Sequence, residues 1–177
     1  LFTDCQCGFR AGRNTIQAVS SFVKQCFHGI ENGNVVCGRF FDLTKAFDTI
    51  SHSIMLEKLD FYGFDNLSLQ FLSSYLDNRY QAVYTNNKIS QYKLIKNGVP
   101  QGSVLGPVLF VIYINDLSHN IGDTNVSPYA YLFADDLAVS VSNNKNTVTD
   151  LLDQTSLKVK EWCDANALVL NNNKQLI

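Results

Sequence analysis

The sequence predicts an α+β fold, in which a small antiparallel sheet packs against helices. Short apolar stretches of strand length lie at residues 35–41, 129–133 and 137–141. Longer segments with apolar residues at every third or fourth position lie between and around them. The last two stretches are separated by Ala134, Asp135 and Asp136 and should form a hairpin. Strands from distant parts of the chain, with helices between them, favour an antiparallel sheet covered by helices on one face.

Composition predicts one folded domain over residues 1–177. Hydrophobic residues make up 46% of the chain and charged residues 17%, which is typical of a globular protein. The most apolar run, residues 104–114, is too short to cross a bilayer, and no membrane association is predicted. Because the chain begins with Leu1 rather than Met and shows no stop signal at its end, we expect it to be a segment of a longer protein.

The first half of the chain is expected to contain mainly helices. The expected elements are a helix over residues 15–30, a mostly buried strand over 35–41, a helix over 53–63 and a helix over 67–76. Gly33 can terminate the first helix, since glycine readily adopts the left-handed conformation that follows a helix. Ser53 can cap the second with its hydroxyl oxygen.

The second half combines hairpins with helices. The expected elements are strands over residues 81–85 and 92–95, a turn over 98–102, a helix over 104–117, the hairpin already described, a helix over 148–162 and a short strand over 167–170. Asn86 and Asn87 should form the turn of the first hairpin, because asparagine tolerates turn conformations. Pro107 lies near a helix start, where its missing N–H is least costly.

Charge and cysteine content restrict the range of functions. The net charge of −2 and pI of about 5.9 argue against a broad basic surface for nucleic acid within this segment. Five cysteines occur without the paired spacing of a zinc site, so free thiols in a reducing compartment are expected.

Adjacent acids at Asp135 and Asp136 suggest a metal site. Asp is also common in turns, and that simpler reading stays open on local grounds. The functional reading needs a third carboxylate and a divalent cation to offset the repulsion between like charges. Asp42, which follows the strand over residues 35–41, is one candidate, although it could instead cap a helix. Asp48 is a rival ligand or an ion-pair partner of Lys45.

Several segments together resemble a known family. Residues 41–50, 98–107 with their continuation to 117, and 133–136 resemble, in order, the catalytic motifs of reverse transcriptases from non-LTR (LINE-type, jockey-like) retrotransposons. The blocks at residues 8–13 and 162–174 resemble flanking family motifs. The resemblance covers nearly the whole chain and implies the palm of a right-hand polymerase. Part of the fingers would lie at the N-terminal end, with the thumb, the remaining fingers and an endonuclease domain elsewhere in a polyprotein.

The resemblance also implies a metal site. Two Mg²⁺ ions, with Mn²⁺ as an alternative ion, would be held by Asp42 and Asp135, with Asp136 completing the acidic cluster. The backbone carbonyl of Leu43 is implied as a further ligand. This choice favours Asp42 over Asp48.

Further positions correspond to nucleotide and template contacts in the family. Phe47 matches an aromatic gate against the 2′-hydroxyl, while Gln101 and Gly102 match positions beside the incoming nucleotide. Lys174 matches a lysine that serves the pyrophosphate leaving group. The residues taken as template-phosphate contacts are Arg10 and Arg13. Each also has an ordinary reading as a core, turn, surface or salt-bridge residue.

The implied reaction is nucleotidyl transfer from a dNTP to a DNA primer on an RNA template, and we expect this segment not to polymerise alone. The family implies an intracellular protein of nucleus and cytoplasm. One alternative is an inactive palm that serves as a nucleic-acid scaffold or belongs to a decayed element. Another is a nucleotide cyclase, against which residues 99–102 and the long helix after them argue.

Overall fold

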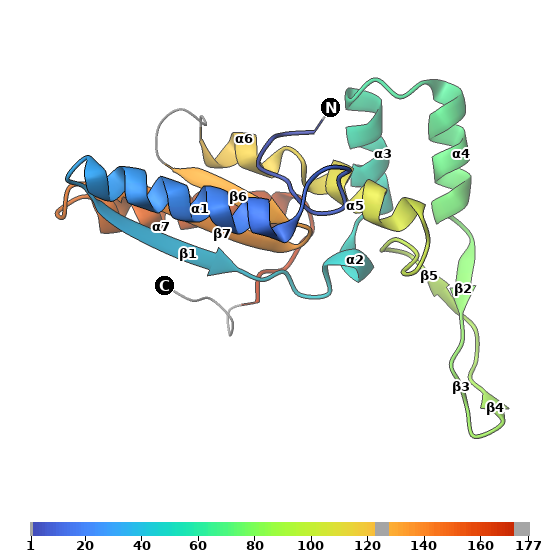
Figure 1. The fold of residues 1–177 in the computed structure, drawn as a ribbon. Coiled ribbons are helices and arrows are strands. Elements are labelled where there is room, and N and C mark those ends of the chain that lie inside the picture. The colour runs from blue at the N-terminus through green and yellow to red at the C-terminus, as the bar shows by residue number, and fades with distance from the viewer. Residues whose placement is uncertain (1, 123–127, 172–177) are drawn as a thin grey trace.

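A three-stranded antiparallel sheet forms the centre of the computed structural model, which describes residues 2–122 and 128–171 (Figure 1). The strands are β1 (Val35–Phe41), β2 (Arg79–Gln81), β3 (Tyr84–Thr85), β4 (Lys88–Ile89), β5 (Lys93–Ile95), β6 (Tyr129–Phe133) and β7 (Asp136–Asn143). The helices are α1 (Thr15–Glu31), α2 (Ala46–Thr49), α3 (His52–Phe61), α4 (Asn66–Leu76), α5 (Leu105–Ile114), α6 (Leu117–Ile121) and α7 (Val148–Ala165). The central sheet has the order β1-β7-β6.

Helices cover both faces of this sheet, so the expectation of one covered face is wrong. On one face, a Cβ at Gly29 of α1 would lie 2.6 Å from the side chain of Val36. On the other, Arg39 donates to the hydroxyl of Ser156 in α7 at 2.6 Å. Positions 36 and 39 of β1 differ by an odd number and therefore point to opposite faces. Figure 1 shows α1 and α7 on the two sides of the strands.

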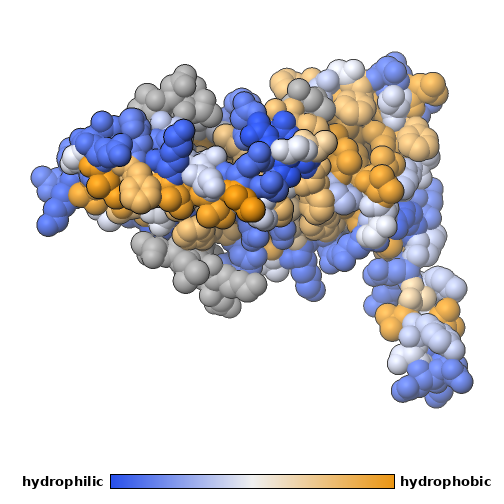
Figure 2. All heavy atoms as spheres, viewed as in Figure 1, coloured by the Kyte–Doolittle hydropathy of each residue, from blue (hydrophilic) through white to orange (hydrophobic). Residues whose placement is uncertain are grey.

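Helix α1 forms where the periodicity predicts it, but most of its apolar side chains face outward. Asn14 caps it by accepting from the N–H of Gln17, whose side chain accepts from Asn14 N–H in return. Its buried residues are the small Ala18 and Gly29, which let the helix backbone approach the sheet. The exposed apolar side chains on it are Ile16, Val19, Val23, Phe27 and Ile30. Figure 2 shows them as an apolar band along the helix.

Strand β1 matches its expected bounds, yet it is not the mostly buried strand that its apolar sequence suggests. Phe41 is its only buried residue, and Val35 and Phe40 are exposed. The reason is its position at the edge of the sheet, where one side has no neighbouring strand. The central strand β7 contains the fully covered Val139 and Val141 instead.

The segment between β1 and α5 differs from expectation in two details. Ser51, rather than Ser53, caps α3 by accepting from the N–H of Ile54. The expected single hairpin forms two short ladders, β2 with β5 and β3 with β4. Its turn does use Asn86 and Asn87, both with positive φ, and the hairpin projects away from the body of the protein (Figure 1).

Helix α5 lies at the centre of the core. It ends at Ile114, earlier than the expected residue 117, and α6 follows after a break. Beside it, the ammonium of Lys58 donates to the Tyr113 carbonyl at 2.7 Å and to Asp116 at 2.6 Å. It also lies 4.8 Å from the ring centroid of Trp162. Burial lowers the pKa of Lys58. Within the described ranges, no helix is long and apolar enough to cross a membrane.

Candidate active site

The hairpin of β6 and β7 forms as the apolar pattern predicts, but its turn is Ala134 and Asp135, and Asp136 already belongs to β7. Phe133 pairs with Asp136, so the connection contains only those two residues. Ala134 has a φ of 56°, a left-handed conformation that is disfavoured for a residue with a Cβ. Asp135 is half-buried and Asp136 is exposed. The tight turn therefore presents both carboxylates at one end of the sheet.

Asp42 lies at the same end of the sheet, because β1 runs antiparallel to β7. Phe41 pairs with Leu137, the second residue of β7. The next position along β1, Asp42, therefore neighbours Asp136. The structure thus brings the backbone of Asp42 to the end of the sheet where Asp135 lies in the turn and Asp136 begins β7.

The segment at residues 168–171 fixes Asp42 from its other side. The side-chain amide of Asn171 donates to the Asp42 carboxylate at 2.9 Å, and the Asn171 N–H donates to its carbonyl at 2.8 Å. Leu43 forms a bridge with Leu170 and is buried. The expected strand over residues 167–170 is thus reduced to one bridge, which orders the backbone next to Asp42.

The donor chemistry of this sheet end fits Mg²⁺. Asp42, Asp135 and Asp136 offer carboxylate oxygens and Leu43 a carbonyl, the hard ligands that Mg²⁺ prefers. Among residues 2–122 and 128–171, however, no three Asp, Glu, His or Cys side chains converge as closely as a metal site requires. The backbone arrangement agrees with the expected site, while the side chains are not gathered into a coordination shell.

Phe47 lies in the short helix α2 and packs between two other rings. It stacks on the buried Phe110 with ring centroids 4.3 Å apart, and Phe9 contacts it edge-on at 6.1 Å. Its carbonyl accepts from the N–H of Val99 at 2.8 Å, which joins the first motif to the second. The ring is therefore half-buried between two other rings, in the segment that follows Asp42.

Gln101 and Gly102 lie on a loop that packs against α2. Gln101 donates to the Asp48 carboxylate at 2.7 Å, so Asp48 serves as a partner of this loop. A Cβ at Gly98 would lie 2.8 Å from the Cα of Asp48, which shows how closely the two segments approach. Gly102 has a φ of 81° and open space around its Cα. The constraint at Gly102 is its backbone conformation rather than crowding within this chain.

The basic residues taken as nucleic-acid contacts have partners within the N-terminal loop. Arg10 donates to the carbonyls of Thr3 and Gln6, and Arg13 pairs with the Asp4 carboxylate at 2.7 Å. Both are thereby tied to the loop that precedes α1. Lys174 lies outside the described residues.

The cysteines agree with the free-thiol prediction. All five are unpaired: Cys5, Cys7, Cys26, Cys37 and Cys163. Burial raises the pKa of Cys5 and of Cys26, and that of Cys163 to about 12. A raised pKa disfavours the reactive thiolate, so these three thiols are poor nucleophiles.

Two residues with contacts to the site had no role predicted from the sequence. Asn171 binds Asp42, and Gln6 binds the backbone of Ala134. Neither belongs to an apolar periodicity or an acidic cluster. The available signal was that they lie within or beside the blocks at residues 8–13 and 162–174, which resemble flanking family motifs but indicate no particular contact.

The fold is the α+β arrangement of a polymerase palm, which solved telomerase structures share. A telomerase of Candida tropicalis truncated from its C-terminal domain shares the fold with a TM-score of 0.73 at 14% identity, over 97% of this chain and 35% of that one. A telomerase of Candida albicans, solved with a fragment of telomeric RNA, gives 0.71 at 12% identity, over 97% and 32%.

Residues 1–177 match the family described as reverse transcriptase (RNA-dependent DNA polymerase), so the chain belongs to the reverse transcriptase family. Curated relatives in Drosophila melanogaster include the probable RNA-directed DNA polymerases of transposon BS, 29% identical over 99% of this chain, and of transposon X-element, 30% identical over 96%. The RNA-directed DNA polymerase of mobile element jockey is 34% identical over 76%. The chain covers 20%, 19% and 15% of these three proteins, respectively.

Proposed function

We propose that this chain is the catalytic palm, with part of the fingers, of an RNA-directed DNA polymerase from a non-LTR retrotransposon. The observation that carries the proposal is that Asp42, Asp135 and Asp136 occupy the same end of the sheet. Membership of the reverse transcriptase family supports the same reaction. The remaining fingers, the thumb and an endonuclease domain would come from the rest of a longer polyprotein, acting in nucleus and cytoplasm.

Asp42, Asp135 and Asp136, with the Leu43 carbonyl, would hold two Mg²⁺ ions. Bound there, the ions supply Lewis acidity that favours an attacking 3′-hydroxylate and stabilises charge on the leaving pyrophosphate. Asn171 would keep the Asp42 carboxylate oriented. The reaction requires no protein nucleophile, and the raised thiol pKa values are consistent with that.

Phe47 would select the sugar of the incoming nucleotide. Its stacking on Phe110 would hold the ring in place when a 2′-hydroxyl approaches. The loop containing Gln101 and Gly102 would border the nucleotide and the template. We propose Lys174 as a contact to the pyrophosphate. Arg10 and Arg13 are proposed as contacts to template phosphates.

The test is primer extension by the full-length protein. With Mg²⁺, it should extend a DNA primer on an RNA template using dNTPs, and Asp135→Ala should abolish extension. Asp164→Ala is the matched control, since the exposed carboxylate of Asp164 pairs with Lys160 on α7, an ion pair of a kind that contributes little. Activity retained in Asp135→Ala would refute the metal-site assignment. Absence of extension by the unmodified protein would instead favour an inactive palm that binds nucleic acid.

A further inference from the structure

Gln6 is completely buried, which is uncommon for a glutamine. Its side-chain oxygen accepts from the N–H of Gly8 at 2.7 Å and from the N–H of Ala134 at 3.1 Å. Its side-chain nitrogen donates to the Ala134 carbonyl at 3.4 Å. The oxygen and the nitrogen of the Gln6 side chain therefore both bind the backbone of Ala134, in the turn between β6 and β7 and 128 positions away in the chain.

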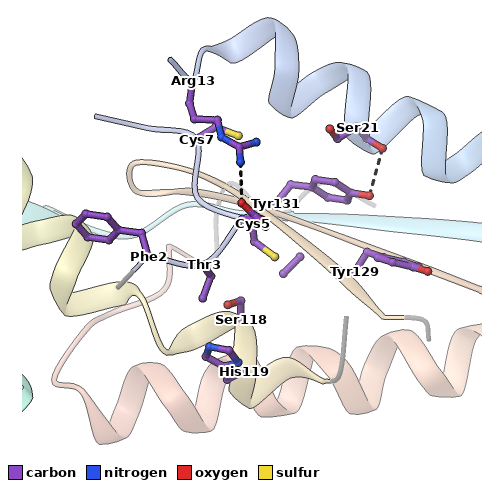
Figure 3. Close-up of a pocket in the computed structure, with 12 residues that line it drawn as sticks. Phe2, Thr3, Cys5, Cys7, Arg13, Ser21, Ser118, His119, Tyr129 and Tyr131 are labelled. Atoms are coloured by element: carbon purple, nitrogen blue, oxygen red, sulfur yellow. Dashed lines mark hydrogen bonds and ion pairs between the residues drawn. The ribbon is translucent and has the colours of Figure 1, made fainter. Parts of the chain in front are cut away.

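The segment around Gln6 lies alongside β6. The N–H of Cys7 donates to the Leu132 carbonyl at 2.7 Å, and the Leu132 N–H donates to the Cys5 carbonyl at 2.9 Å. Gln6 thus forms a parallel bridge with Leu132. Figure 3 shows Cys5 of this segment beside Tyr131 of β6. The segment, α1, α6 and β6 together line a cavity of about 660 Å³.

The backbone bonds alone are enough for this segment to cover the edge of β6. That role therefore does not explain why the side-chain amide of Gln6 is buried. The conformation of Ala134 does explain it. The left-handed φ of Ala134 is disfavoured, and such a conformation persists when surrounding contacts fix it. Gln6 binds both backbone polar groups of this residue.

Gly8 makes a second, independent contact with the same turn. A Cβ at Gly8 would lie 2.2 Å from the nitrogen of Ala134 and 2.9 Å from its Cα. These are backbone atoms, so they cannot yield as the end of a flexible side chain would. Only glycine permits the loop to lie this close to the turn.

We propose that Gln6 and Gly8 form a clamp that holds the Ala134–Asp135 turn in the conformation from which Asp135 binds metal. Gln6 is a positioning residue in this scheme, acting through the backbone of Ala134. The inference rests on the proposed function, because it assigns Asp135 to the metal site.

The test compares full-length Gln6→Leu with the unmodified protein. Leucine removes the amide and leaves the backbone pairing with β6 available. In single-turnover primer extension, the rate should fall on the order of 10- to 100-fold, because small displacements of catalytic groups are costly. The dNTP concentration for half-maximal rate should change less than about threefold, since the nucleotide contacts lie elsewhere. Mn²⁺ binding, measured by electron paramagnetic resonance, should weaken, and amide exchange at Ala134 should accelerate.

Two further variants separate positioning from general destabilisation. Leu76→Ala removes a buried side chain of α4, far from the sheet (Figure 1), and should lower the melting temperature without these changes in Mn²⁺ binding and exchange. Gly8→Ala pushes on the turn and should reproduce the Gln6→Leu changes. It also provides the test if Gln6→Leu fails to fold.

The outcomes distinguish the clamp from the proposed function. Unchanged exchange at Ala134 in both Gln6→Leu and Gly8→Ala would overturn the clamp, whatever the enzyme does. Faster exchange with unchanged Mn²⁺ binding and rate would overturn the positioning role. A third outcome is that the unmodified protein shows no primer extension and no Mn²⁺ binding that Asp135→Ala removes. That outcome would refute the proposed function and, with it, the role of the clamp in catalysis. Amide exchange at Ala134 would still test whether the clamp exists.

Discussion

Replacing Asn171 with alanine should weaken the candidate metal site without dismantling it. The side-chain amide of Asn171 donates to the Asp42 carboxylate at 2.9 Å. Alanine removes that donor but keeps the bond from the backbone N–H of residue 171 to the Asp42 carbonyl. The carboxylate should therefore lose its orientation while the bridge between Leu43 and Leu170 persists.

The magnitude follows from the type of bond. Hydrogen bonds to charged groups contribute about 1.5–3 kcal/mol, and the lower end applies because Asp42 and Asn171 are only half-buried. If this stabilisation is needed in the transition state, a loss of about 1.5 kcal/mol corresponds to a rate roughly tenfold lower. A misoriented ligand should also raise the Mg²⁺ concentration needed for half-maximal rate.

The assay is primer extension by the full-length protein over a Mg²⁺ titration. Asn32→Ala, which changes an exposed asparagine at the end of α1, provides the matched control and should leave the titration unchanged. A rate for Asn171→Ala within twofold of the unmodified protein at every Mg²⁺ concentration would refute the role assigned to this amide. An equal loss in Asn32→Ala would refute it as well.

Three other predictions concern the gate, the loop contact and the core. Phe47→Ala should remove the ring braced by Phe110 and increase ribonucleotide use, measured as the ratio of kcat/KM for rNTP and dNTP; an unchanged ratio would exclude the gate. Gly98→Ala should lower stability by about 2 kcal/mol, because its φ of 87° is strained with a Cβ and that atom would meet the Asp48 backbone; chemical denaturation measures this, and no loss would contradict the contact. Burial raises the pKa of Cys163 from 9.0 to about 12, so the unfolded chain releases this proton first and the free energy of unfolding should decline as pH rises from 9 toward 12. The contribution is fully present below pH 9, and Cys163→Ala should flatten the decline in urea titrations; a decline of the same slope would argue against it.

Elements whose formation depends on nearby residues were predictable. The hairpin of β6 and β7 follows from two apolar stretches with a short connection, and α1 follows from its periodicity. The cap of α3 was not predictable from local sequence, since Ser51 and Ser53 both suit the position. A bridge between Ser51 and Asn97 in the distant loop accompanies the observed choice.

Contacts between distant segments limited the other predictions. Apolar periodicity does not reveal which side of a helix meets the sheet when small residues allow close approach, as Ala18 and Gly29 do in α1. The choice of Asp42 over Asp48 as a metal ligand came from motif resemblance and stays a prediction. The contacts of Gln6 and Asn171 could not be predicted from the sequence, because their partners lie 128 and 129 positions away. A single amide side chain also produces no repeating pattern in the sequence.

The bridge between Leu43 and Leu170 has a consequence for folding order. The segments that meet at the sheet end come from opposite ends of the chain, so their contacts have high sequence separation and require closure of large loops. During synthesis, Asp42 emerges well before Asp135, and Asn171 emerges later still. We therefore expect the sheet end with Asp42, Asp135 and Asp136 to assemble late. A chain stopped before residue 170 should lack the contacts that Leu170 and Asn171 make there.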